Sequence, residues 1–189
     1  GLSALPSPVR ADLPIVMGAE GPKNVALAAE IADGWVPMLF APEAMGFFQD
    51  ALNEGFARPG ARRSQADFEV LASVPVVIED DVDSAADKLR PMVALYAGGM
   101  GAREANFHFD VFVRLGFEAE ATRIQELYLA GQHSEAMAAV PTSMVEAIAL
   151  IGPREKVRDD LEAYRDSMLT SMLLSGSAAT LRTMAELVL

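Results

Sequence analysis

The sequence contains no cysteine and only two histidines. The absence of thiols excludes a disulfide framework and a thiolate metal site, and it is typical of proteins of the reducing cytoplasm, where we expect this protein to be located. His108 and His133 lie far apart and have no carboxylate neighbours at the spacing of metal ligands. We therefore expect no metal site.

Basic residues are scarce as well. Lysine and arginine number 15 against 27 acidic residues, which gives a formal net charge of −12. Such a chain has no basic face to neutralise the phosphates of a nucleic acid or an acidic membrane. It also has no apolar run long enough to span a bilayer, and it does not begin with methionine. We expect neither a nucleic-acid nor a membrane partner, and we expect the chain to be a fragment of a longer protein.

Hydrophobic residues make up 51% of the chain, which predicts a compact globular protein with a sizeable core. Strand-like apolar runs alternate with helical patterns, and Pro75 predicts a bend in the third run. The strands are expected at 13–18, 34–40, 68–78 and 168–175, and the helices at 22–32, 42–57, 153–166 and 178–188. Strands that are apolar throughout and joined by helices indicate a parallel sheet in an α/β fold.

A long segment from 80 to 152 interrupts this alternation, and it reads as helices separated by glycines. In β/α proteins such an insertion leaves from the carboxyl end of a strand, where functional sites are built. We expect it to act as a lid. The chain then divides into βα units over 1–79, a helical insertion over 80–152, and a last helix, strand and helix over 153–189.

The loop Gly18-Ala19-Glu20-Gly21 joins the first strand to its helix. Glycines let a ligand approach the backbone closely, and the free N–H groups and positive dipole end of the helix suit a phosphate. The same pattern also describes an ordinary tight connection. Lys23 could neutralise a phosphate, although a lysine in a first helical turn is more often only solvated.

The stretch "LPIVMGAEGPKNVALAAEIADGW" resembles a signature of the luciferase-like monooxygenase superfamily, in the group that uses the deazaflavin coenzyme F420. The segments "YAGGMGAREANF", "EAEATRIQELYLAGQHSEAMAAVP" and "IGPREKVRDDLEAYRDS" resemble the downstream part of the same group. The resemblance implies a (β/α)8 TIM barrel of which this chain forms the C-terminal half, with its strands as the last four.

The resemblance further implies an oxidoreductase that transfers hydride between F420 and a small organic substrate. The catalytic face would come from the N-terminal half, so we assign no catalytic residue here and expect the isolated chain to be inactive. Gly18, Ala19, Glu20 and Gly21 match the family loop that holds the cofactor phosphate, with Lys23 nearby. The alternatives are an FMN-dependent monooxygenase or a non-catalytic half-barrel for binding or oligomerisation.

Two further motifs carry structural expectations. Asp33-Gly34-Trp35 is expected to form a turn in which Gly34 supplies a positive φ before Trp35 begins a strand. The aromatic cluster from Asn106 to Phe109 could face a substrate, but such clusters are more often packing.

Half a barrel leaves apolar edges at the first and last strands, and a concave face that we expect to expose whichever of Val36, Leu39, Val70 and Ala72 point inward. We therefore expect a homo-oligomer, or a complex with the missing N-terminal half.

Overall fold

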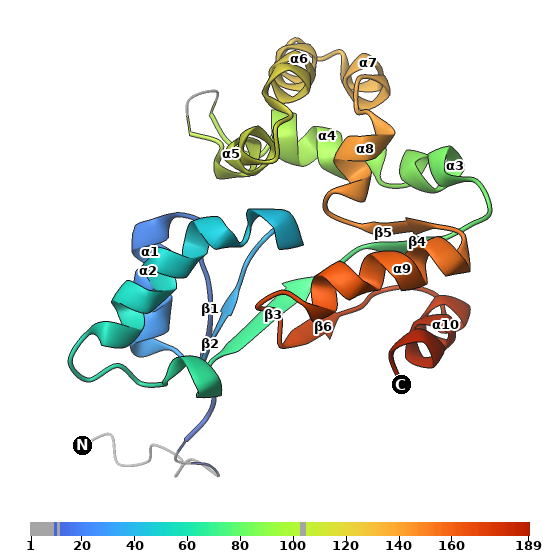
Figure 1. Cartoon of the computed structure of the whole chain (residues 1–189). Helices are drawn as coiled ribbons and strands as arrows, with labels where there is room; N and C mark the ends of the chain where they lie inside the picture. Colours follow the sequence, from blue (N-terminus) through green and yellow to red (C-terminus); the bar gives the residue numbers. More distant parts are fainter. Residues whose placement is uncertain (1–9, 11, 103–104) are drawn as a thin grey trace, which may run out of the picture.

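The computed structural model describes residues 10, 12–102 and 105–189, so Arg103 and Glu104 of the second family-like segment lie outside the described residues. A parallel four-stranded sheet has the order β1-β2-β3-β6, and a second parallel pair joins β4 to β5. Figure 1 shows these strands with helices between them. The strands are β1 (Val16–Gly18), β2 (Gly34–Val36), β3 (Glu69–Ser73), β4 (Val76–Ile78), β5 (Leu150–Gly152) and β6 (Ser171–Leu173). The expected α/β fold with parallel strands is confirmed.

Helices cover one face of the four-stranded sheet. They are α1 (Pro22–Ile31), α2 (Gly46–Ala57), α9 (Arg154–Arg165) and α10 (Ala178–Val188), with two short 3-10 turns at Pro42–Ala44 and Gln65–Asp67. Side chains alternate along a strand, so Trp35, Val70 and Ala72 all point toward this helical layer. The Trp35 ring meets the Phe48 ring of α2 edge-on, with 5.1 Å between centroids.

The other face of the sheet is open. The strand register places Val16, Gly34, Leu71 and Leu173 on it, and Val16 and Leu173 are 41% and 46% exposed. Of the four residues expected to contribute to this face, Val36 has the same strand parity as Gly34 and lies on it, whereas the other three do not. Val70 and Ala72 have the opposite strand parity and are buried, Leu39 is buried in a second core, and Val36 is half-buried.

The third predicted strand is split at Pro75. The part before it, β3, pairs with β2 and β6, whereas β4 pairs with β5. The carbonyl of Pro75 accepts a hydrogen bond of 2.9 Å from the Leu150 N–H. The insertion at 80–152, which was expected to be helical, therefore ends in a strand. The reason is that β4 leaves the four-stranded sheet and pairs with residues 150–152.

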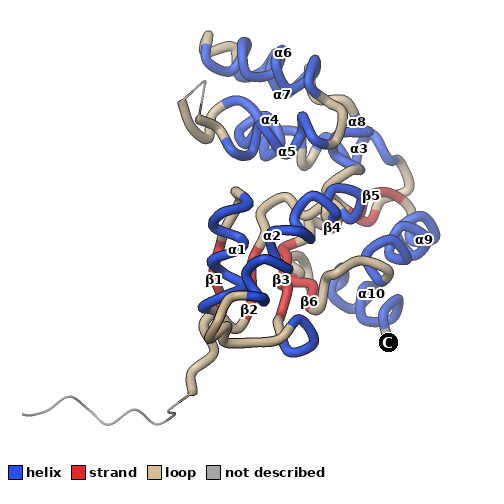
Figure 2. Tube along the Cα trace, turned by 60° about the vertical axis from the view of Figure 1, so that its left-hand side comes forward, coloured by secondary structure: helices blue, strands red, loops and turns tan. Residues whose placement is uncertain are grey.

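The rest of the insertion is helical, as expected, and has its own core. It contains α3 (Val82–Asp87), α4 (Arg90–Gly98), α5 (Phe107–Arg114), α6 (Glu118–Leu129), α7 (His133–Ala138) and α8 (Thr142–Glu146). Phe112, Ile124 and Met144 are fully buried among these helices. Figures 1 and 2 show the insertion stacked beyond the carboxyl ends of β1 and β2. Within the described residues, no helix is long and apolar enough to cross a membrane.

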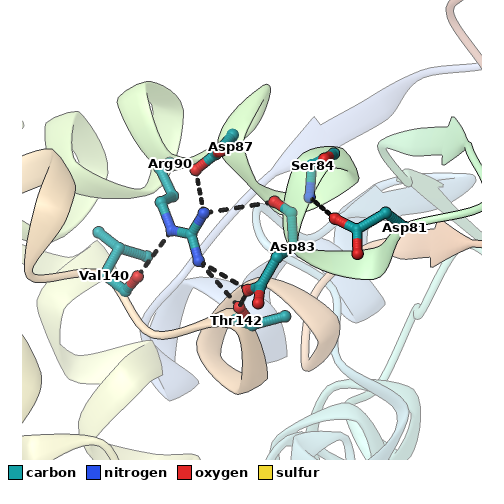
Figure 3. Close-up of polar contacts among 7 residues, drawn as sticks. All are labelled: Asp81, Asp83, Ser84, Asp87, Arg90, Val140 and Thr142. Carbon is teal, nitrogen blue, oxygen red and sulfur yellow. Dashed lines mark hydrogen bonds and ion pairs between the residues drawn. The ribbon is translucent and has the colours of Figure 1, made fainter.

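Arg90 ties the two ends of the insertion together (Figure 3). Its guanidinium donates to the Val140 carbonyl at 2.9 Å and to the Thr142 hydroxyl at 2.8 Å, and it pairs with Asp83 and Asp87. The Thr142 hydroxyl and Arg90 together lower the pKa of Asp83. These contacts anchor α3, α4 and α8 to one another, next to the β4-β5 pair.

Candidate functional site

A cavity of about 380 Å³ lies where β1 and β2 end and α1 begins. The start of α5 closes its far side, so the sheet and the insertion both contribute. The lining residues are Gly18, Ala19, Glu20, Gly21, Asn24, Val36, Pro37, Met38, Phe107 and His108. All four predicted loop residues thus line one cavity. Lys23 does not line it and is exposed.

No side chain caps the start of α1. Gly21 is its N-cap with no side-chain cap, Pro22 has no N–H, and the first turn holds no acidic residue. The loop is positioned from β2, because the Trp35 indole N–H donates to the Ala19 carbonyl at 2.8 Å. Gly21 and Asn24 both line the cavity, so the positive end of the α1 dipole lies at its wall, while the N–H groups of Asn24 and Val25 donate to the Gly21 carbonyl at 3.0 Å.

Neither packing nor backbone conformation requires glycine at Gly18 and Gly21. A Cβ at either position would meet nothing within 4 Å, and neither has a positive φ. The space beside both glycines is free for a ligand. Gly34 is different, because a Cβ there would lie 2.7 Å from the Glu69 carbonyl oxygen. The positive φ expected at Gly34 is absent, and close strand packing is the reason for that glycine.

Asp33 is structural, as expected of this motif. Its carboxylate accepts from Arg62 Nε at 2.8 Å, from Arg63 Nε at 2.7 Å and from the Ile15 N–H at 2.7 Å. These hydrogen bonds hold the segment before β1 to the end of α1. They also hold the pKa of Asp33 well below its usual range.

Glu20 places a carboxylate in the cavity. Its Oε1 accepts a hydrogen bond of 2.7 Å from the Met38 N–H, which links the β1-α1 loop to the segment after β2. Burial raises the pKa of Glu20 to about 7, although the Met38 N–H and the charge of Arg114 act in the opposite direction. Burial thus favours the protonated form of this carboxyl group.

The α5 helix brings aromatic side chains to the cavity. Asn106 is its N-cap and accepts from the N–H groups of His108 and Phe109, while its amide donates to the carbonyls of Tyr96 and Ala97. Phe107 is 61% exposed, and His108 packs edge-on against Tyr96 with 4.9 Å between ring centroids. Burial lowers the pKa of His108, which favours the neutral ring. Asn106 thus caps the start of α5, while Phe107 and His108 line the cavity.

Two further groups of residues line the cavity. Val36 ends β2, and Pro37 and Met38 follow it. The parallel pairing of β2 with β1 brings the carboxyl ends of the two strands together, so the strand pattern could have indicated these residues. The sequence allowed the aromatic cluster with Phe107 and His108 to face a substrate but favoured packing, and the tertiary structure places both residues in the cavity lining. The described part of the chain has no cluster of three or more His, Asp or Glu side chains that could hold a metal.

The sequence matches the luciferase-like monooxygenase family over residues 1–171. It is 45% identical over 188 residues to a Mycobacterium tuberculosis protein that carries the provisional name of coenzyme F420-dependent oxidoreductase. It is 29% identical over 164 residues to the 5,10-methylenetetrahydromethanopterin reductase of Methanopyrus kandleri. These matches cover 99% and 86% of this chain.

The structure agrees with these matches. It resembles the solved coenzyme F420-dependent tetrahydromethanopterin reductase from Methanopyrus kandleri, with a TM-score of 0.72 and 27% identity over 94% of this chain. That match covers 49% of the reductase chain, and the two sequence matches cover 54% and 44% of those relatives. The chain thus spans about half the length of its relatives. On sequence and structure together, the chain belongs to the luciferase-like monooxygenase family.

Proposed function

We propose that this chain is the C-terminal half of the barrel of a coenzyme F420-dependent oxidoreductase, which transfers hydride between the deazaflavin and a small organic substrate. When bound, F420 supplies the hydride donor or acceptor. The residues of this chain hold the phosphate-bearing end of the cofactor in the cavity. The observation that carries the proposal is the open space beside Gly18 and Gly21, at a helix start that no side chain caps.

In this proposal, the β1-α1 loop and the helical insertion have separate roles in binding the cofactor. The β1-α1 loop offers backbone N–H groups to the phosphate, with Gly18, Ala19, Glu20 and Gly21 forming the wall and Lys23 adding long-range positive charge. The helical insertion acts as a lid through α5, which covers the cavity with Phe107 and His108. The reactive face of the deazaflavin is contacted by the other half of the protein, so this chain alone does not catalyse the reaction.

Substitutions that fill the space beside Gly18 and Gly21 test this proposal. We expect Gly18→Val and Gly21→Val each to weaken F420 binding by about tenfold or more, because the new side chain occupies the volume of the ligand. Gly46→Val is the matched control, since a Cβ at Gly46 also meets nothing within 4 Å but lies at the start of α2, outside the cavity lining. Equilibrium dialysis against F420 measures all three variants. Wild-type affinity in both cavity variants would contradict the proposal.

A further inference from the structure

Leu39 has an unusual backbone conformation in the segment that follows β2. Its φ is +54°, and it is the only non-glycine residue with a positive φ among the described residues. The left-handed region is unfavourable for a residue such as leucine, because the Cβ atom lies too close to the following carbonyl oxygen. Such a conformation persists only where the surrounding structure imposes it.

Three consecutive residues of this segment belong to three different parts of the molecule. Met38 lines the cavity, Leu39 is buried in the core of the insertion, and Phe40 is buried in the core of the four-stranded sheet and its helices. Leu39 is 6% exposed and Phe40 is 1% exposed. In an extended strand, Met38 and Phe40 would share one face. The turn at Leu39 separates them, and the two cores hold the residues of that turn.

The same turn determines one hydrogen bond of the cavity wall. The Met38 N–H donates to Glu20 Oε1 at 2.7 Å. A change of φ at Leu39 is a rotation about its N–Cα bond, and it turns the preceding residue relative to the Leu39 side chain. Because that side chain is fixed in the core of the insertion and β2 is fixed in the sheet, a relaxation of φ has to displace Met38.

We propose that Leu39 is a positioning residue for Glu20. The core of the insertion holds the Leu39 side chain, this packing imposes the left-handed conformation, and that conformation aims the Met38 N–H at the Glu20 carboxyl group. The insertion thus acts on the cavity in two ways: it supplies Phe107 and His108 directly, and it sets the position of Glu20 through Leu39. This role belongs to the cavity wall and does not depend on which ligand the cavity binds.

Alanine and glycine at position 39 separate the backbone effect from the loss of packing. Both substitutions remove the buried side chain, but only alanine keeps the penalty of the left-handed conformation. Hydrogen exchange of the Met38 N–H, followed by NMR, measures the outcome. The side chains next to this N–H are those of Pro37 and Met38, so its intrinsic exchange rate stays the same. We expect exchange in Leu39→Ala to be about fivefold or more faster than in Leu39→Gly, and slowest in the wild type.

The Glu20 carboxyl group gives a second readout. The Met38 N–H lowers the pKa of Glu20, so this pKa, measured by NMR titration, should rise in Leu39→Ala. It should return to the wild-type value in Leu39→Met, which restores a long apolar side chain. If Leu39→Ala does not fold, Leu39→Val takes its place, because a β-branched residue is also incompatible with a positive φ.

Leu127→Ala is the matched control. Leu127 of α6 is 6% exposed in the same core and has no positive φ, so this variant loses packing without releasing a strained backbone. It should leave the exchange of the Met38 N–H close to that of the wild type. Equal exchange rates in Leu39→Ala and Leu39→Gly, an unchanged pKa of Glu20, or an equal effect of Leu127→Ala would overturn the inference. None of these measurements uses a ligand, so their outcome is independent of the proposed function.

Discussion

At the scale of single residues, Asp33 shows how one buried carboxylate organises the approach to the site. Its side chain is only 7% exposed, and it joins the backbone before β1 to two arginines that follow α2. The position of β1 determines where the loop with Gly18 and Gly21 begins. Asp33 therefore supports the cavity without contacting it.

The pKa of Asp33 makes this contribution dependent on pH. Because the pKa is lowered in the folded state, the stabilisation is present above the unfolded-state pKa of about 3.9 and is lost as the pH falls further, through the folded-state pKa. We expect Asp33→Asn to be less stable than the wild type at neutral pH and to approach it as the solution is acidified below about pH 4.

Urea unfolding between about pH 3 and pH 7 measures this effect. Asp50→Asn, an exposed change on α2, serves as the control. If Asp33→Asn and wild-type protein differ by the same free energy of unfolding at every pH, the ionised pair does not contribute in this way.

At the scale of secondary-structure elements, the contact between α1 and α2 explains why the first helix is so rich in alanine. Val25, Ala26, Ala28 and Ala29 are buried in the core. A Cβ at Gly55 of α2 would lie 2.2 Å from the Ala26 carbonyl oxygen and 2.5 Å from the Ala29 Cβ. The two helices thus pack too closely for larger side chains, and this packing orients the start of α1 toward the cavity.

We expect Gly55→Ala to destabilise the protein by ~1–3 kcal/mol, because the added methyl group meets backbone that cannot move aside without separating the helices. Gly46→Ala is a matched control in the same helix. A Cβ there meets nothing within 4 Å, so this variant should be as stable as the wild type or more stable. Thermal and urea unfolding of both variants measure the difference. Equal stabilities would show that the helices can separate at little cost.

At the scale of the whole molecule, the open face of the four-stranded sheet is the main unpartnered surface. Val16 and Leu173 are large apolar side chains on it, and β1 and β6 end the sheet without a further strand among the described residues. Exposed apolar faces and open strand edges are typical of surfaces that another chain or domain covers. The chain spans about half the length of its relatives, so the other half of the barrel fits this role.

In the absence of that half, we expect the chain to associate with itself. Light scattering at micromolar concentration should detect a dimer or a larger species. Leu173→Lys should weaken the association, because it places a charge on the open face. Leu129→Lys, on the exposed surface of α6, should leave it unchanged. A monomeric wild-type chain would show that the open face needs no cover.

The sequence by itself determined the features that depend on local pattern. Apolar strands alternating with helices indicated a parallel α/β fold, and glycines before an uncapped helix indicated the loop that lines the cavity. These predictions were possible because strand pairing, helix initiation and glycine geometry act over a few residues.

Only the tertiary structure decided the rest. Pro75 was expected to bend a strand, but it directs β4 to a new partner more than seventy residues away. The side chains of the open face follow from the register between strands, which separates Leu71 from Val70. The insertion folds back so that Phe107 and His108 meet Glu20 across one cavity. These outcomes depend on contacts between segments that are distant in the sequence. Local sequence patterns do not predict such contacts, because they carry no information on how distant segments pack.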